Sequence, residues 1–492
     1  MTDVAATDRA RAARIVWFRD DLRLADHPAL LEAASAGPVV CVYVLDEESE
    51  RLRPLGAASR WWLAGSLRAL DRSLMEFGGR LTLLRGAAAS VIPRLARQLR
   101  ASEVSWNRRY DRAGRRVDDA VEQRLAADAV IARTFQGSLL YEPATIRSGA
   151  GSSIKVFTPF WRKAKTLGEP RAARGKPARI AFLPDVPSDR LDDWRLEPSG
   201  PDWASGLRAH WVPGESGAHE RLATFLETGL AGYATLRDRP DRLHTSRLSP
   251  HLHFGEVSPF QLWHAARMAA ETSGGKAASS ADVEKFSAEL GWREFSYHLL
   301  HDVPDLAQRN FQPRFDNFPW RSDQAAAMAW RKGLTGYPLV DAGMRELWAT
   351  GWMHNRVRMV AASFLVKHLL LDWREGEVWF WDTLVDADPA NNPASWQWIA
   401  GSGADAAPYF RIFNPVLQGE RFDPAGDYVR RWVPELARLP NDHIHCPWSA
   451  SPQVLAQAGI TLGRDYPTPL VDHGVARQRA LAAFASLKLP PA

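Results

Sequence analysis

The first 135 residues alternate short apolar runs with amphipathic stretches, and this alternation constrains the fold more than any other feature of the chain. The apolar runs have the length of buried strands, and the stretches between them have the apolar spacing of helices. Strands that alternate with helices form a parallel sheet covered by helices. The sequence therefore predicts an α/β domain with strands at Ile15–Phe18, Val39–Leu45, Leu81–Leu84, Glu103–Trp106 and Val130–Phe135.

The connection after the first strand indicates what kind of sheet this is. Asp26 and Pro28 mark a helix start there, because proline is favoured in the first helical turn. The Gly-x-Gly-x-x-Gly pattern of dinucleotide-binding sheets does not occur at this point. We expect a Rossmann-like sheet without that fingerprint, so this domain need not be the place where a dinucleotide binds.

Two further regions follow the α/β domain. Residues 136–209 are rich in Pro, Gly, Arg and Ser, which is typical of a connecting segment on the surface. From residue 210 onward, apolar residues recur with a helical period. The expected organisation is an α/β domain at 1–135, an interdomain linker at 136–209 and a large all-α domain at 210–492.

The charge balance is mildly basic, with 62 Lys and Arg against 57 Asp and Glu. Such a balance is compatible with nucleic acid but does not require it. The only cysteines, Cys41 and Cys446, exclude a disulfide framework and a cysteine-rich metal site and fit a reducing cytoplasm. The N-terminus lacks a signal-peptide layout, and the longest apolar stretch is broken by Lys367 and His368. We expect a cytoplasmic protein with no membrane segment and no metal.

A run of hydroxyl side chains precedes an expected helix start near residue 250. Thr245, Ser246 and Ser249 supply hydroxyl donors, and Arg247 supplies a fixed cation. Together with the free backbone N–H groups of a helix N-terminus, they form a good phosphate cradle. The same residues also fit an N-cap cluster that binds nothing, and the segment taken alone favours that interpretation.

Two sets of polar residues have helical spacing in the second half. Glu289, Trp292 and Arg293 are spaced i, i+3 and i+4, so they share one face, which a surface salt bridge beside a packed tryptophan also explains. Asn355 and Arg358 lie in the second set, with Asn355 expected mid-helix, where asparagine has poor propensity.

Arg358 lies in an increasingly apolar run and needs a carboxylate partner. Asp386 and Asp388 are two residues apart, as in some metal sites, but no further ligands accompany them. We expect Asp386 to pair with Arg358 and Asp388 to face the polar edge of a ligand.

The motifs are ordered along nearly the whole chain in the pattern of a known family. They are FRDDLRLADHPAL at 18–30, KVFTPFW at 155–161, TSRLS, GWREF, the segment 335–359, DADPANNPASWQW, and DAAPYFRIFNP at 405–415. The chain resembles the photolyase/cryptochrome family, and within it the class I cyclobutane pyrimidine dimer photolyases. The resemblance implies an N-terminal parallel α/β domain and a C-terminal helical domain that holds FAD.

The resemblance also implies which residues hold FAD. Asn355 would face flavin N5 and, by accepting from N5–H, favour reduced FADH⁻, whereas plant sensors of the family place an acid there. Arg358 would pair with Asp386 beneath the flavin ring system. The other implied contacts are Tyr233, Thr245, Ser246, Arg247, Leu248, Ser249, Arg293, Ala387 and Asp388.

The implied activity is light-dependent repair of damaged DNA, single- or double-stranded. Excited FADH⁻ would give an electron to a flipped pyrimidine dimer, whose cyclobutane ring opens before the electron returns. Glu289 would hydrogen-bond the dimer, and Trp292 and Trp398 would stack on it. Arg293 and Arg356 would contact the DNA, so that binding weakens with salt.

Two other members of the family are alternatives. A (6-4) photoproduct photolyase has a histidine at the position of Met359, so Met359 and Glu289 favour cyclobutane dimers. A cryptochrome photoreceptor signals instead of catalysing and often carries a long C-terminal tail, whereas this chain ends soon after the last motif.

Tryptophan is abundant, with 21 in the chain, and each taken alone is more typical of a packed core. Trp396, Trp373 and Trp320 match the family's electron-transfer chain from flavin to surface. A second, antenna chromophore stays open, because Ala113 and Gly114 stand where folate-binding members have Asn and Glu. The family also implies a monomer.

Overall fold

The structure is a computed structural model that describes residues 12–272, 278–405 and 410–487. The chain divides into two compact units. Unit 1 comprises residues 1–154, 159–227 and 246–304, and unit 2 comprises residues 155–158, 228–245 and 305–492. The domain boundaries expected at 135 and 209 stay a prediction. Residues 406–409 of the motif at 405–415 lie outside the described residues.

Unit 1 contains a five-stranded sheet with strand order β3-β2-β1-β4-β5, and every pairing in it is parallel. The predicted α/β fold is confirmed, and each predicted strand end lies within one residue of the observed one. The strands are β1 (Arg14–Phe18), β2 (Val39–Leu45), β3 (Leu81–Arg85), β4 (Glu103–Asn107) and β5 (Ile131–Phe135).

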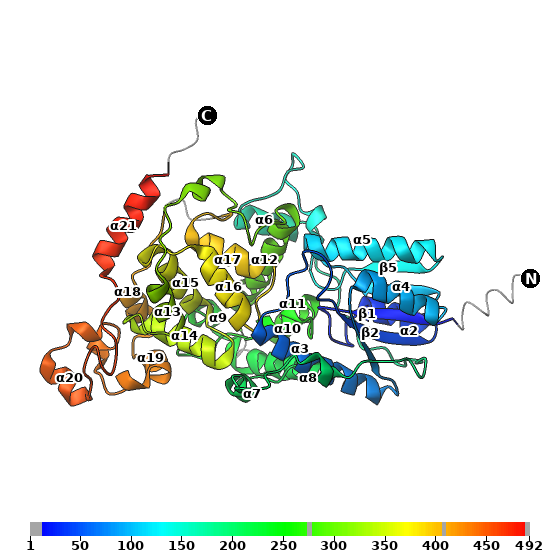
Figure 1. Ribbon diagram of the computed structural model, residues 1–492, viewed down its shortest axis with the longest axis horizontal. Coiled ribbons are helices and arrows are strands. Elements are labelled where there is room, and N and C mark those ends of the chain that lie inside the picture. The colour runs from blue at the N-terminus through cyan, green and yellow to red at the C-terminus, as the bar shows by residue number, and fades with distance from the viewer. Residues whose placement is uncertain (1–11, 273–277, 406–409, 488–492) are drawn as a thin grey trace, which may run out of the picture. The chain divides into compact units, whose positions relative to one another are not determined.

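Helices cover the sheet, whose central strands β1 and β2 are apolar and buried along nearly their whole length. Ile15 and Trp17 of β1 pack in one cluster with the apolar sides of α4 (Ala88–Gln98) and α5 (Arg112–Ala127), which run side by side in Figure 1. Cys41 of β2 is fully buried, as expected of a small hydrophobe, and burial raises the pKa of its thiol. The other sheet helices are α2 (Pro28–Ala36) and α3 (Ala57–Glu76).

Parts of the segment at 136–209 are more deeply buried than its composition predicts. It contains α6 (Phe157–Lys165) and α7 (Ser205–His210), and the side chains of Phe160 and Trp161 are buried. The Trp161 ring lies against Gly291, where a Cβ atom would come within 2.7 Å of it. A surface location for the whole segment is therefore wrong, because its aromatic residues pack into unit 1.

The other long regular elements of the described chain are helices, joined by loops. Those of unit 1 are α8 (Glu215–Thr224), α10 (Ser249–His253), α11 (Pro259–Thr272) and α12 (Ser280–Asp302). Those of unit 2 are α9 (Tyr233–Leu236), α13 (Gln324–Arg331), α14 (Pro338–Thr350), α15 (Asn355–Ser363), α16 (Trp373–Thr383), α17 (Asn391–Ala400), α18 (Pro415–Phe422), α19 (Asp427–Trp432), α20 (Pro452–Ala458) and α21 (His473–Ala485).

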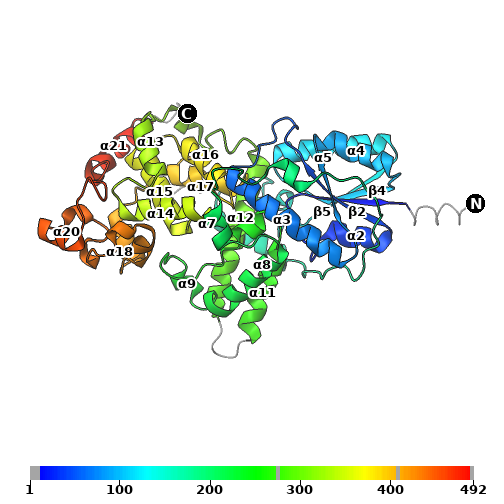
Figure 2. The same cartoon turned by 60° about the horizontal axis from the view of Figure 1, so that its bottom comes forward.

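The core of unit 2 lies among α14, α15, α16 and α17, which are grouped together in Figure 2. Lys367 and His368, which interrupt the longest apolar stretch, are both buried here in a π-helical turn (Phe364–His368). Burial lowers the pKa of Lys367 to about 7. Within the described ranges, no helix combines the length with the apolar character that crossing a bilayer requires.

Candidate functional site

The hydroxyl-rich segment leads into α10, as predicted. Ser249 is the first residue of the helix, and Arg247 holds a left-handed backbone with φ 51°. Arg221 of α8 is a neighbour of this segment, because burial and the positive charge of Arg247 lower its pKa to about 10. Two neighbouring guanidinium groups favour an anionic ligand, which relieves their mutual repulsion.

A buried carboxylate that the sequence analysis missed anchors α10. Glu256 is fully buried and lies 2.5 Å from Nδ1 of His251. The same carboxylate accepts hydrogen bonds from the backbone N–H of Gly214 at 2.6 Å and from the indole N–H of Trp62 at 3.1 Å. Glu256 therefore ties α10 to α3 and to the start of α8 inside unit 1.

Glu289, Trp292 and Arg293 all lie on helix α12, as their spacing predicted. Its N-terminus is fixed by a capping box between Ser279 and Asp282. Glu289 is partly exposed and pairs with Lys285 at 3.1 Å across one helical turn.

Arg293 is held within unit 1 instead of lying free on the helix face. Its Nη1 donates to the carbonyl oxygen of Ser138 at 2.7 Å, and its guanidinium lies 5.0 Å from the centre of the Tyr297 ring. The DNA and cofactor contacts expected of Arg293 stay predictions.

The next residue, Glu294, is a second buried acid that the sequence analysis missed. Its carboxylate accepts the backbone N–H of Tyr141 at 3.1 Å. Burial raises the pKa of Glu294 to about 7, and the hydrogen bonds it accepts only partly oppose that effect.

Asn355 does not lie mid-helix, so that expectation is wrong. Helix α14 ends where Gly351 adopts a left-handed backbone with φ 67°, and a new helix, α15, begins with Asn355 itself. His354 caps α15 by accepting the N–H of Arg356 on its Nδ1 at 3.2 Å. Asn355 is exposed at this helix start. Because it does not lie mid-helix, the poor helix propensity of asparagine calls for no special role here.

The predicted ion pair between Arg358 and Asp386 is confirmed. Nη2 of Arg358 lies 2.8 Å from Oδ2 of Asp386, whose side chain is 2% exposed. The same guanidinium donates from Nε to the carbonyl oxygen of Met353 at 2.7 Å. Arg356, two residues before Arg358, pairs with Asp238 at 2.6 Å inside unit 2.

Asp388 has a local role in the structure. Its Oδ1 accepts the backbone N–H groups of Ala390 and Asn391 at 2.8 and 2.6 Å, and its Oδ2 accepts the side-chain amide of Asn391 at 2.7 Å. It therefore shapes the turn that holds the buried Ala387 and leads into α17.

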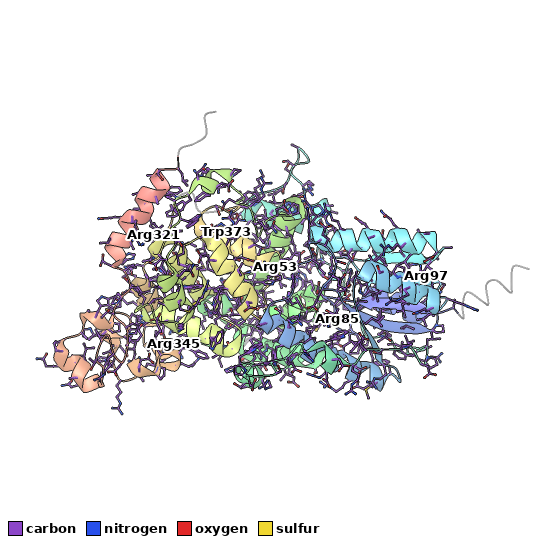
Figure 3. The ribbon with its side chains drawn as sticks, in the orientation of Figure 1. Arg53, Arg85, Arg97, Arg321, Arg345 and Trp373 are labelled. Carbon is purple, nitrogen blue, oxygen red and sulfur yellow. The ribbon has the colours of Figure 1, made fainter. Side chains whose placement is uncertain are left out.

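The tryptophans of the expected electron-transfer chain belong to one region of unit 2. Trp373 and Trp396 are buried in the same cluster, and Trp320 packs against it. Figure 3 marks Trp373, which begins α16 and donates from Nε1 to Oδ1 of Asn310 at 3.0 Å. Trp398 is partly buried and donates from Nε1 to the carbonyl oxygen of Asp405 at 3.0 Å.

The predicted site residues are divided between the two units. Unit 1 contains Ser246, Arg247, Leu248, Ser249, Glu289, Trp292 and Arg293. Unit 2 contains Tyr233, Thr245, Trp320, Asn355, Arg356, Arg358, Met359, Trp373, Asp386, Ala387, Asp388, Trp396 and Trp398.

Comparison with known proteins decides the family. Residues 14–178 match the model of DNA photolyase, and residues 286–486 match the FAD binding domain of DNA photolyase. The chain is 50% identical over 476 residues, which is 96% of this chain and 98% of the relative, to the deoxyribodipyrimidine photo-lyase of Agrobacterium fabrum. The chain belongs to the photolyase/cryptochrome family.

Two other members show where this photolyase-family chain lies within the family. The crystal structure of a bacterial class III photolyase from Agrobacterium tumefaciens is 50% identical, with a TM-score of 0.93 over 97% of this chain and 98% of that chain. Cryptochrome-1 of Arabidopsis thaliana is 40% identical over 96% of this chain and 70% of that protein. These similarities do not support the class I assignment that the motifs suggested.

Each unit, taken by itself, contains residues that suit part of a flavin dinucleotide. In unit 1, the neighbouring cations Arg221 and Arg247 and the hydroxyl of Ser249 suit a pyrophosphate. In unit 2, the ion pair of Arg358 and Asp386 supplies a fixed donor and acceptor, with the arginine in the first turn of the helix that begins with Asn355.

Proposed function

We propose that this protein is a light-dependent DNA photolyase that splits cyclobutane pyrimidine dimers and works with reduced FAD. The observation that carries this conclusion is the 50% identity, over 96% of the chain, to a protein named deoxyribodipyrimidine photo-lyase. The match of residues 286–486 to the FAD binding domain of DNA photolyase supports the cofactor. When bound, reduced FAD supplies a photoexcited electron donor, which is chemistry that no side chain provides.

The side chains of the protein bind and orient the cofactor and the lesion. The amide oxygen of Asn355 would accept a hydrogen bond from flavin N5–H, and the pair of Arg358 and Asp386 would orient the ring system. Trp292 and Trp398 stack on the extruded bases, each stack contributing about 1–3 kcal/mol. Glu289 hydrogen-bonds the dimer and exchanges its Lys285 partner for it on binding.

The subclass follows the similarity to the class III photolyase instead of the motif-based class I assignment. Glu289 and Met359 favour cyclobutane dimers as the substrate, because a (6-4) enzyme would carry a histidine at the position of Met359. The monomeric state, the cytoplasmic location, the domain boundaries and the second chromophore stay predictions.

Repair of defined lesions tests the proposal. Purified protein with bound FAD is reduced, mixed with an oligonucleotide that carries one cyclobutane dimer, and exposed to blue light. We expect dimer loss in light and none in the dark, with a (6-4) lesion left intact. A matched oligonucleotide assay at rising salt should show weaker binding.

Two results would overturn the proposal. If the purified protein contained no flavin, the proposed repair reaction would have no electron donor. Flavin binding without repair of either lesion would instead indicate a photoreceptor, which the similarity to cryptochrome-1 makes the second candidate.

A further inference from the structure

Helix α14 carries two buried carboxylates, and each accepts a tyrosine hydroxyl from elsewhere in unit 2. Asp341, in the first turn, accepts the hydroxyl of Tyr466 at 2.6 Å. Glu346, in the second half, accepts the hydroxyl of Tyr428 at 2.6 Å. All four side chains are at least 98% buried, so the two pairs match in chemistry and environment.

The two pairs differ in what else the carboxylate holds. Asp341 accepts the backbone N–H groups of Thr335 and Gly336, at 2.7 and 3.0 Å, which precede α14. Glu346 accepts the backbone N–H of His354 on the same oxygen, Oε2, that accepts the Tyr428 hydroxyl, at 3.2 Å. One pair therefore fixes the entry to α14, and the other fixes the connection from α14 to α15.

That connection determines where α15 begins. His354 is the N-cap of α15, and its carbonyl oxygen accepts the N–H groups of Val357 and Arg358, each at 2.9 Å. Gly351, at the other end of the connection, is held by the N–H of Val385 at 2.8 Å. Asn355 follows His354 directly, so a shift of the His354 backbone moves the Asn355 amide with it.

We propose that Glu346, supported by Tyr428, is a positioning residue that fixes the Asn355 amide through the backbone of His354. This inference rests on the proposed function, because Asn355 matters only if it faces a flavin. Removing the Tyr428 hydroxyl takes away a donor at 2.6 Å from Oε2. A buried carboxylate that loses a donor reorients to recover one, which weakens its hold on the His354 N–H.

The test compares Tyr428→Phe with Tyr466→Phe in the full-length protein with bound FAD. Each variant removes one hydroxyl from one buried carboxylate of α14, so a purely structural effect lowers the melting temperature in both. Only Tyr428→Phe should shift the midpoint potential of the bound FAD. The same variant should lower the quantum yield of repair by pre-reduced enzyme about tenfold. Glu346→Gln should produce the same two changes, because a neutral amide oxygen is a weaker hydrogen-bond acceptor than a carboxylate oxygen.

The outcomes separate this inference from the proposed function. Wild-type protein that binds no flavin or repairs no dimer sinks the proposed function. Wild-type activity, with flavin potential and repair yield equal in Tyr428→Phe and Tyr466→Phe, overturns the role of Glu346. If Tyr428→Phe does not fold, Glu346→Gln and Asp341→Asn give the same comparison on the carboxylate side.

Discussion

The carboxylate of Asp386 lies 2.8 Å from Nη2 of Arg358, and that guanidinium also donates to the carbonyl oxygen of Met353. The pair therefore joins the turn before α17 to the residues just before α15. Asp386 is almost fully buried, whereas Arg358 is 24% exposed, so the arginine keeps access to a ligand. This exposure is what the proposed role of the pair in binding FAD requires.

Asp386→Asn should release FAD. The variant leaves the Arg358 cation without its carboxylate, and truncating one partner of such a pair costs about 2 kcal/mol or more, which is over tenfold in affinity. The ratio of flavin absorbance to protein absorbance after purification measures the loss. Asp372→Asn is the control, since Asp372 pairs with Arg374 at 2.9 Å and asparagine still caps α16. Equal flavin content in both variants would contradict the assignment.

Trp373→Phe should slow photoreduction of oxidised FAD strongly and leave repair by chemically reduced enzyme intact. Phenylalanine is much harder to oxidise than tryptophan, so it interrupts transfer between Trp396 and Trp320. Bleaching of flavin absorbance under blue light with an external thiol reports the rate. Trp17→Phe, at a buried tryptophan of the sheet, is the matched control. Unchanged photoreduction in Trp373→Phe rules the chain out.

The buried acid Glu294 should make stability depend on pH. Its pKa is raised from an ordinary 4.5 to about 7, so between these values the folded state holds a proton that the unfolded state releases. The resulting stability is present below pH 4.5 and is lost as pH rises through 7. The expected size is on the order of 1–3 kcal/mol.

Urea unfolding at pH 5 and pH 8 measures this effect. Glu294→Gln should be less sensitive to pH than the wild type, because glutamine accepts the Tyr141 N–H at either pH. Glu284→Gln, at an exposed position of the same helix, should keep the wild-type dependence. A Glu294→Gln variant with the wild-type pH dependence would refute the assignment.

Local sequence pattern predicted the sheet well. The strands are short, mainly apolar runs between amphipathic stretches, so their ends follow from the sequence to within a residue. The pairing of Arg358 with Asp386 was also predictable, because an arginine in an apolar run requires an acid.

Contacts between residues far apart in the sequence were not predictable in this way. The sequence analysis singled out neither Glu294 nor Glu346, yet both are buried, with hydrogen bonds to Tyr141 and Tyr428. Asn355 was misplaced because the helical period continues across Gly351, where the backbone actually leaves the helix. Periodicity gives the face of a helix but not the partner that buries an acid, since the partner comes from the fold.

Gly376→Ala should destabilise the protein, although alanine is favoured over glycine by about 1 kcal/mol in a helix interior. Gly376 lies on the face of α16 against which the six-membered ring of Trp396 packs, and a Cβ there would overlap that ring. Relieving the overlap displaces Trp396, at a cost of about 1–3 kcal/mol.

Whether Gly376→Ala raises or lowers the stability of the protein therefore decides whether helix propensity or side-chain packing dominates at this position. Urea unfolding of Gly376→Ala should give a lower midpoint than the wild type, and photoreduction should slow because Trp396 moves away from Trp373. Gly149→Ala, where an added Cβ has open space within 4 Å and the backbone is not left-handed, should leave both measurements unchanged. A stabilised Gly376→Ala with normal photoreduction would mean that Trp396 does not pack tightly on α16.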